Sequence, residues 1–133
     1  MKKSNFLCPK CKGHLNAGGY VIFSTKNKRK QSGLVLLSPK VGSYTVKHHE
    51  SYGFEKGEAI DFACPICSKS LHAKENSENV SIIMVDENDT EYRVLFSRIY
   101  GNQSTYVLSN DDVEVFGGDA LEFNDLLEDS DFL

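Results

Sequence analysis

Two stretches of the chain decide its fold: Phe6-Leu7-Cys8-Pro9-Lys10-Cys11-Lys12-Gly13-His14-Leu15 and Phe62-Ala63-Cys64-Pro65-Ile66-Cys67-Ser68-Lys69-Ser70-Leu71. Both read Phe-x-Cys-Pro-x-Cys-x-x-x-Leu, and together they hold all four cysteines of the protein. This is the internal repeat that the sequence shows, and it is short. It therefore predicts two copies of one turn and not a solenoid.

The spacing within each stretch suits metal binding. Two residues between the cysteines allow a tight turn to direct both sulfurs to one point, with backbone N–H groups donating to them. Pro9 and Pro65 stiffen the turns, because a proline ring fixes φ near about −65°. Two such turns facing each other supply four thiolates in a tetrahedron, which suits Zn²⁺.

The paired turns resemble the zinc knuckles of zinc-ribbon and rubredoxin-like proteins, over two stretches of ten residues. The resemblance implies that Cys8, Cys11, Cys64 and Cys67 are the ligands of one structural Zn²⁺. Zinc ribbons separate their cysteine pairs by about 15–20 residues, whereas 52 residues separate them here. Either the ribbon carries a large β insertion, or a β domain folds between two knuckles that close it.

Other chemistries of the cysteines are weighed against zinc. Iron remains an alternative, since a tetrahedral site of four sulfurs does not distinguish the two metals. A thioredoxin-type redox motif is disfavoured, because neither pair begins a convincing helix within a βαβ pattern. Four thiolates also close the tetrahedron, which leaves no open position for a catalytic water. With no phosphate-binding or nucleophile-elbow motif in the chain, we expect a protein that is not an enzyme.

The remaining sequence predicts short strands separated by turn signals. They are expected at residues 20–25, 33–38, 44–48, 59–62, 70–73, 80–85, 92–99, 105–108 and 113–116. The predicted fold is mostly β: a zinc-ribbon-like knuckle pair clasping an antiparallel β meander, with a short acidic C-terminal helix or tail, the helix over 119–128. The predicted regions are a zinc-knuckle region with inserted hairpins (1–73), a β meander packed on it (74–118) and an acidic segment (119–133).

Composition sets the class of protein. The chain has 133 residues, of which 40% are hydrophobic and 26% charged, as in ordinary soluble domains. No apolar run approaches the roughly 18 residues of a membrane helix. Only two apolar residues follow the basic start of the chain, so we expect no export signal. The expected location is the cytoplasm, where a reducing environment disfavours disulfides.

Charge divides the chain into two halves. Residues 1–60 hold eleven Lys and Arg against three Glu (+8), and residues 61–133 hold four against sixteen Asp and Glu (−12). The acids concentrate in 111–133. We therefore expect the protein to bind another macromolecule, as a protein-interaction adaptor or regulatory module that uses this acidic segment and exposed strand edges. In a variant of this hypothesis the acidic tail covers the basic half, within one chain or across a homodimer.

The alternative function is nucleic-acid binding through the basic hairpin loop, with Lys26, Lys28, Arg29 and Lys30. The resemblance to zinc ribbons supports this alternative, since zinc ribbons of transcription and translation proteins use such surfaces. Lys2, Lys3, Lys10 and Lys12 would add to that surface. Because the net charge is −4, such binding would need this local patch and would depend strongly on salt. Three aromatic residues near the loop predict either base stacking or core packing: Tyr20, Phe23 and Tyr44.

Four histidines complete the candidates. His14 and His72 follow the two knuckles. Each could orient a thiolate or replace one as a ligand; the alternative is an ordinary imidazole at the surface. His48 and His49, with Glu50, are a weaker candidate for a second metal site, because neighbouring residues of a strand face opposite ways.

Overall fold

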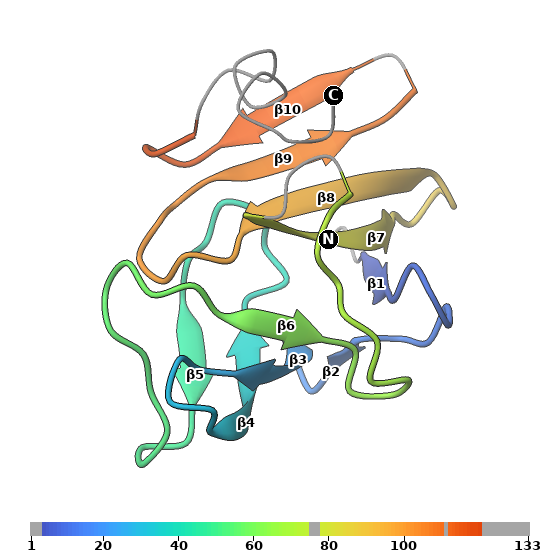
Figure 1. Cartoon of the computed structure of the whole chain (residues 1–133). Helices are drawn as coiled ribbons and strands as arrows, with labels where there is room; N and C mark the ends of the chain where they lie inside the picture. The colour runs from blue at the N-terminus through green and yellow to red at the C-terminus, as the bar shows by residue number, and fades with distance from the viewer. Residues whose placement is uncertain (1–3, 75–77, 111, 121–133) are drawn as a thin grey trace.

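The chain forms two antiparallel β-sheets that pack face to face, one in the upper and one in the lower half of Figure 1. The computed structural model describes residues 4–74, 78–110 and 112–120, and within them every regular element is a strand. The strands are β1 (Asn5–Leu7), β2 (Asn16–Ala17), β3 (Tyr20–Lys26), β4 (Ser32–Leu37), β5 (Val46–His48), β6 (Asp61–Ala63), β7 (Asn79–Val85), β8 (Glu91–Ser97), β9 (Thr105–Leu108) and β10 (Val113–Phe116). In this described part, no helix is long and apolar enough to span a bilayer.

Each sheet has five strands. The upper sheet has the order β1-β7-β8-β9-β10. The lower sheet has the order β2-β3-β4-β5, and β6 joins it by pairing with β3. Strand β3 can hold both β2 and β6 along one edge because they pair with different residues: β2 with Tyr20 and Val21, and β6 with Ser24 to Lys26.

The two sheets contain equivalent hairpins. Val21 pairs with Leu37 in the β3–β4 hairpin, and Val80 pairs with Phe96 in the β7–β8 hairpin, a shift of 59 residues at both positions. The following strands obey the same rule, because β4–β5 and β8–β9 have the same register after that shift. We call residues 5–48 the first unit and residues 61–107 the second unit. The structural repeat thus extends far beyond the knuckles in which the sequence shows it.

The turns of the two hairpins have the same conformation as well. The Asn27 side-chain oxygen accepts hydrogen bonds of 3.0 Å from the N–H groups two and four residues later. Asp86, 59 residues on, accepts the same two bonds at 2.9 Å. Lys30 and Asp89 both adopt a left-handed backbone, with φ of 64° and 62°. Side-chain-to-backbone bonds of this kind are what favour Asn and Asp at the start of turns.

The units exchange their first strands. Strand β1 of the first unit pairs with β7 of the second, with Phe6 opposite Met84. Strand β6 of the second unit pairs with β3 of the first, with Phe62 opposite Thr25 at the equivalent register. Each knuckle follows an exchanged strand and leads the chain back to the sheet of its own unit. The knuckles therefore lie where the chain crosses between the sheets.

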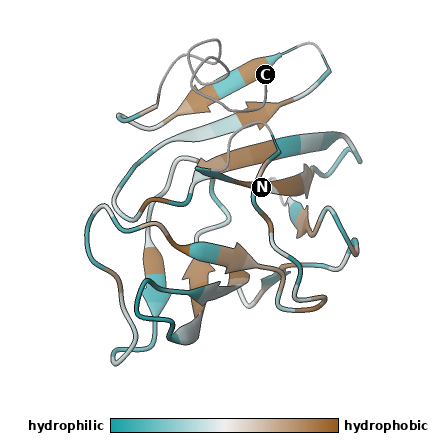
Figure 2. Ribbon diagram, viewed as in Figure 1, coloured by the Kyte–Doolittle hydropathy of each residue, from teal (hydrophilic) through white to brown (hydrophobic). Residues whose placement is uncertain are grey.

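The core lies between the sheets and is shared by both units. Strand β3 shows why, since every second residue of it (Val21, Phe23 and Thr25) is buried, as the period of a strand requires. Twelve of the buried hydrophobic residues form equivalent pairs, which are Phe6 and Phe62, Cys8 and Cys64, Leu15 and Leu71, Val21 and Val80, Phe23 and Ile82, and Val35 and Val94. Figure 2 shows the contrast between apolar strands and the hydrophilic turn that joins β3 to β4.

The all-β antiparallel prediction is confirmed. Residues 105–108 and 113–116 form strands with the predicted bounds, whereas β1 and β2 lie where no strand was expected. The strand expected at 70–73 is not formed, because Ser70 and His72 make only isolated bridges there. The alternative of a C-terminal helix over 119–128 falls, from residue 121 on, outside the described residues. The division into 1–73, 74–118 and 119–133 stays a prediction.

Candidate metal centre

The two knuckles have the same backbone hydrogen bonds. In the first, the Lys12 N–H donates to the Cys8 carbonyl (2.9 Å), and the Cys8 N–H donates to the carbonyl of residue 13 (3.0 Å). In the second, Ser68 donates to Cys64 (2.9 Å), and Cys64 donates to Lys69 (3.0 Å). Lys12 and Ser68 both have positive φ, of 63° and 67°. The shared motif Cys-Pro-x-Cys thus folds into one turn twice.

Backbone amides are aimed at the sulfurs. The N–H groups of Lys10 and Cys11 lie 3.3 and 3.4 Å from the Cys8 sulfur. The Cys64 sulfur receives the same contacts, at 3.3 and 3.4 Å, from the N–H groups of Ile66 and Cys67. Such donors favour the thiolate form and orient it. The expectation drawn from the spacing, that each turn directs N–H groups to its own sulfur, is met at both sites.

The four sulfurs converge although the cysteine pairs are far apart in sequence. The Sγ atoms of Cys8 and Cys67 are 3.8 Å apart, and those of Cys11 and Cys64 are also 3.8 Å apart. All four lie within 4.8 Å of one another. A tetrahedral ion with Zn–S bonds of about 2.3 Å requires sulfurs about 3.8 Å apart, so the donor set fits such an ion. These separations also exceed the length of a disulfide, about 2.05 Å.

Exposure differs between the two cysteines of each pair. Cys8 and Cys64, the first of each pair, are buried, whereas Cys67 is partly exposed and Cys11 is exposed. The site therefore lies near the surface, where the chain crosses between the sheets, and two of its four cysteines are buried.

The two buried thiols titrate as a pair. Burial raises the pKa of Cys8, but N–H groups of Cys11 and Lys10 outweigh it and lower the pKa to about 7. Burial and the Cys8 sulfur raise the pKa of Cys64 to about 11, against N–H groups of Cys67 and Ile66. One thiolate near neutral pH thus opposes the ionisation of the second, as expected for coupled groups. A divalent cation removes this repulsion, since its charge favours every thiolate.

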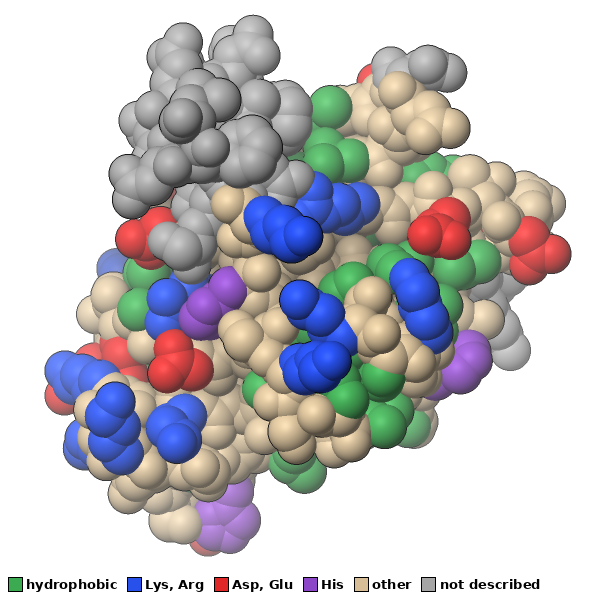
Figure 3. All heavy atoms as spheres, turned by 45° about the vertical axis from the view of Figure 1, so that its right-hand side comes forward, with side chains coloured by type: hydrophobic (Ala, Val, Ile, Leu, Met, Phe, Trp, Pro, Cys, Tyr) green, Lys and Arg blue, Asp and Glu red, His purple; other side chains and the backbone are tan. Residues whose placement is uncertain are grey.

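Lysines belong to both knuckles: Lys10 and Lys12 in the first and Lys69 in the second. Figure 3 turns this side of the molecule forward and shows Lys and Arg groups gathered near the centre of the face. Four thiolates around a divalent ion would retain two negative charges, which cationic side chains on the same face would help to stabilise.

The histidines lie outside the sulfur cluster. The buried Nε2 of His72 has no hydrogen-bond partner and lies 4.0 Å from an Asp61 oxygen. Burial and the nearby Arg98 lower the pKa of His72 against the opposing effect of Asp61. His48 and His49 form no metal cluster with Glu50 among the described residues. A Ser51 hydroxyl instead lies 2.7 Å from the Nδ1 of His49.

The basic loop at 26–30 has acidic neighbours that the sequence analysis did not foresee. The Lys28 ammonium pairs with Glu55, and its backbone N–H donates to the buried Glu58 at 2.6 Å. No ion pair to Lys26, Arg29 or Lys30 is found in the described part of the chain. Glu55 and Glu58 belong to the segment after β5, so only the folded chain brings them to the loop.

The aromatic candidates divide between the core and local contacts. Phe23 is fully buried and therefore packs in the core. The Tyr20 hydroxyl accepts from the Lys47 ammonium at 2.6 Å. The Tyr44 hydroxyl donates to the Phe116 carbonyl at 3.2 Å, which ties the first unit to β10.

Comparison with known proteins yields no relative. No protein-family model matches the chain, and no curated protein or solved structure matches it either.

Proposed function

We propose that the protein is a non-enzymatic interaction module of the cytoplasm in which one structural Zn²⁺ locks two equivalent β units together. The observation that carries the metal proposal is the pair of 3.8 Å contacts between sulfurs of opposite knuckles. Each contact joins a cysteine of one unit to a cysteine of the other. A metal bound there links both units.

Zinc would act on the fold through the crossing strands. Because each knuckle lies where the chain passes between the sheets, an ion held by both knuckles fixes both crossings at once. Structural zinc sites contribute about 10–16 kcal/mol to small zinc modules. Since a whole domain is stable by only about 5–15 kcal/mol, metal binding and folding would be one event. Four thiolates also leave the ion no open position, which supports a structural and not a catalytic role.

Exposed strand edges support the proposed macromolecular partner. Among the described residues, strand β10 is the last strand of the upper sheet, and Val113 and Val115 on it are 37% and 47% exposed. Glu114 lies between them, and the sequence around β10 is acidic. An open edge with apolar side chains can accept an extended segment of a partner by strand addition. A basic, extended segment of another protein suits this edge best.

Native mass spectrometry of the purified protein tests the metal proposal. We expect one zinc ion per chain, and we expect a chelator to remove both the ion and the cooperative thermal transition. Iron would be recognised by its mass and its visible absorption. A reduced, metal-free protein that keeps the full transition would overturn the proposal. The same spectra report whether the chain forms a homodimer.

The alternative remains nucleic-acid binding through the loop Lys26, Lys28, Arg29 and Lys30. The ion pair of Lys28 with Glu55 reduces the charge that this loop offers, which favours the protein-interaction hypothesis. Titration of single- and double-stranded DNA and RNA at several salt concentrations separates the two. Binding that weakens steeply with salt, and disappears when these four residues become Gln, would establish the alternative. No binding at low salt would exclude it.

A further inference from the structure

A cavity with a volume of about 420 Å³ lies between the sheets. Two equivalent loops, 38–45 and 97–104, close it on one side. The Ser43 N–H donates to the carbonyl of residue 40 in the first, and the Asn102 N–H donates to that of residue 99 in the second, both at 3.0 Å. Gly42 and Gly101 have φ of 90° and 88°, a backbone that glycine adopts without strain. Both units thus contribute matching walls.

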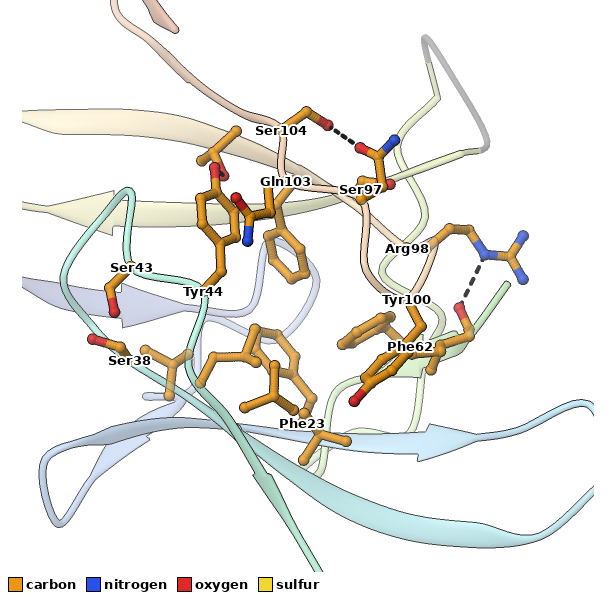
Figure 4. A pocket seen from close by; sticks show the side chains of 18 of the residues that line it. Phe23, Ser38, Ser43, Tyr44, Phe62, Ser97, Arg98, Tyr100, Gln103 and Ser104 are labelled. Carbon is orange, nitrogen blue, oxygen red and sulfur yellow. Dashed lines mark hydrogen bonds between the residues drawn. The ribbon is translucent and has the colours of Figure 1, made fainter. Parts of the chain in front are cut away.

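The inner wall is apolar and aromatic. Phe23, Phe62 and Phe96 stack edge to face, with ring centres 5.4–5.6 Å apart, and all three line the cavity. Figure 4 shows Phe23 at the bottom of the pocket and Tyr44 and Gln103 across from it. These rings contact one another edge to face, and together they form one wall of the cavity. Its volume falls in the range of about 300–1,000 Å³ that is usual for small-molecule pockets.

The charged residues at the pocket are all cationic. Lys40, Lys56 and Arg98 line it, and no Asp or Glu does so among the described residues. Arg98 is already engaged, because its guanidinium donates to the Ile60 carbonyl (2.9 Å) and to Asp61 (2.6 Å). Lys40 and Lys56 are exposed and make no ion pair in the described part of the structure. Their ammonium groups are therefore available to an anion.

We propose that this pocket binds a fatty acid, with the alkyl chain against Phe23, Phe62 and Phe96 and the carboxylate at Lys40 and Lys56. Apolar walls without acids suit an alkyl chain, and the unpaired ammonium groups of the two lysines that line the pocket suit an anionic head. The three phenylalanine rings offer no hydrogen-bond partner, so polar groups of a ligand placed against them would stay unsatisfied. This site is separate from the metal centre, and its ligand is independent of the macromolecular partner proposed above.

Calorimetric titration of the zinc-loaded full chain with octanoate, dodecanoate and hexadecanoate tests the proposal. We expect one saturable site whose Kd tightens by about fourfold per added methylene until the cavity is full. Dodecanol, which has the chain without the charge, should bind more weakly than dodecanoate by roughly fivefold. Absence of saturable binding across the series, or equal affinity for dodecanol and dodecanoate, would overturn the proposal.

Matched variants locate the site. Leu37→Trp on β4 fills the cavity and should abolish binding, whereas Leu34→Trp, on the opposite face of the same strand and 53% exposed in the wild type, should not. Lys40→Gln combined with Lys56→Gln should weaken dodecanoate binding by roughly fivefold and leave dodecanol binding unchanged.

If Leu37→Trp fails to fold, methyl NMR of the wild type locates the site instead. Dodecanoate should then shift the methyl signals of Leu37 and Val94 and not that of Ile66; the reverse would contradict the assignment.

Discussion

Lys30 and Asp89 occupy the same position in the two equivalent hairpin turns, with φ of 64° and 62°, yet they carry opposite charges. The contrast extends through both turns, since residues 26–30 carry four basic side chains and residues 86–89 carry three acidic ones. The two units therefore share a backbone and differ in surface. Because equivalent turns of the two units carry opposite charges, the protein can present two different contact surfaces to partners.

Replacing either left-handed residue by glycine should stabilise the fold. A non-glycine residue in the left-handed region costs about 1–2 kcal/mol, part of which glycine recovers. We expect Lys30→Gly and Asp89→Gly each to raise the free energy of unfolding by about 0.5–1 kcal/mol in urea titrations. Lys28→Gly, at a turn position without positive φ, serves as the control and should not stabilise. Unequal signs for the two glycine variants would mean that the turns are not equivalent.

Gly117 directly follows β10, and it should tolerate no side chain. Its φ is 97°, and a Cβ atom there would lie 2.1 Å from the Gln103 carbonyl oxygen. We expect Gly117→Ala to destabilise the protein by about 2–4 kcal/mol, from backbone strain and overpacking together. The neighbouring Gly118 is a matched control, because a Cβ atom there meets nothing within 4 Å. Equal melting temperatures for the two variants would contradict this account.

The sequence predicted the strands and the cysteine cluster, because both leave local patterns. Alternating apolar residues mark β3, and the matched flanks of the cysteines mark two like turns. Strands β1 and β2 have three and two residues, too short for a pattern, and β1 is held by pairing with the other unit.

The full repeat escaped sequence analysis for two physical reasons. Equivalent positions share conformation more than chemistry, as Asn27 and Asp86 show by making the same hydrogen bonds with different side chains. The spacing is also uneven: 56 residues separate Cys8 from Cys64, but 59 separate Val21 from Val80. A search at one fixed period therefore finds the knuckles and misses the hairpins. The pocket between the two loops was likewise invisible, since it exists only after the sheets pack.

Because the two units are equivalent, corresponding cysteines of the proposed zinc site should matter equally. Cys8 and Cys64 are both buried and accept two N–H groups each, so Cys8→Ser and Cys64→Ser should damage the protein equally. We expect each variant to lose tight zinc binding and the cooperative thermal transition, because the remaining three sulfurs leave the ion incompletely held. Zinc content by mass spectrometry and calorimetric melting check this. His14→Ala, close to the first knuckle and outside the sulfur cluster, should keep both properties.

Glu58 should stabilise the basic loop in a manner that depends on pH. Burial raises the pKa of its carboxyl group, but N–H donors from Glu55 and Lys28, with the charges of Lys28 and Arg29, bring the pKa below its ordinary value. Because the pKa is lower in the folded than in the unfolded chain, the stabilisation is complete above the unfolded-state pKa. It is lost as the pH falls through the folded-state pKa.

Glu58→Gln is therefore expected to lower the free energy of unfolding by about 1.5–3 kcal/mol at pH 7, as for hydrogen bonds to charged groups. The difference from the wild type should shrink as the pH falls below the ordinary range of carboxyl groups, because protonation then gives both proteins a neutral side chain. Urea unfolding of both proteins in excess zinc measures this difference, from pH 7 down to the lowest pH at which both keep their zinc. Glu55→Gln, at an exposed ion pair, should cost less than about 1 kcal/mol at any pH. A Glu58→Gln difference that stays constant with pH would show that packing, and not the charge, is what the carboxylate contributes.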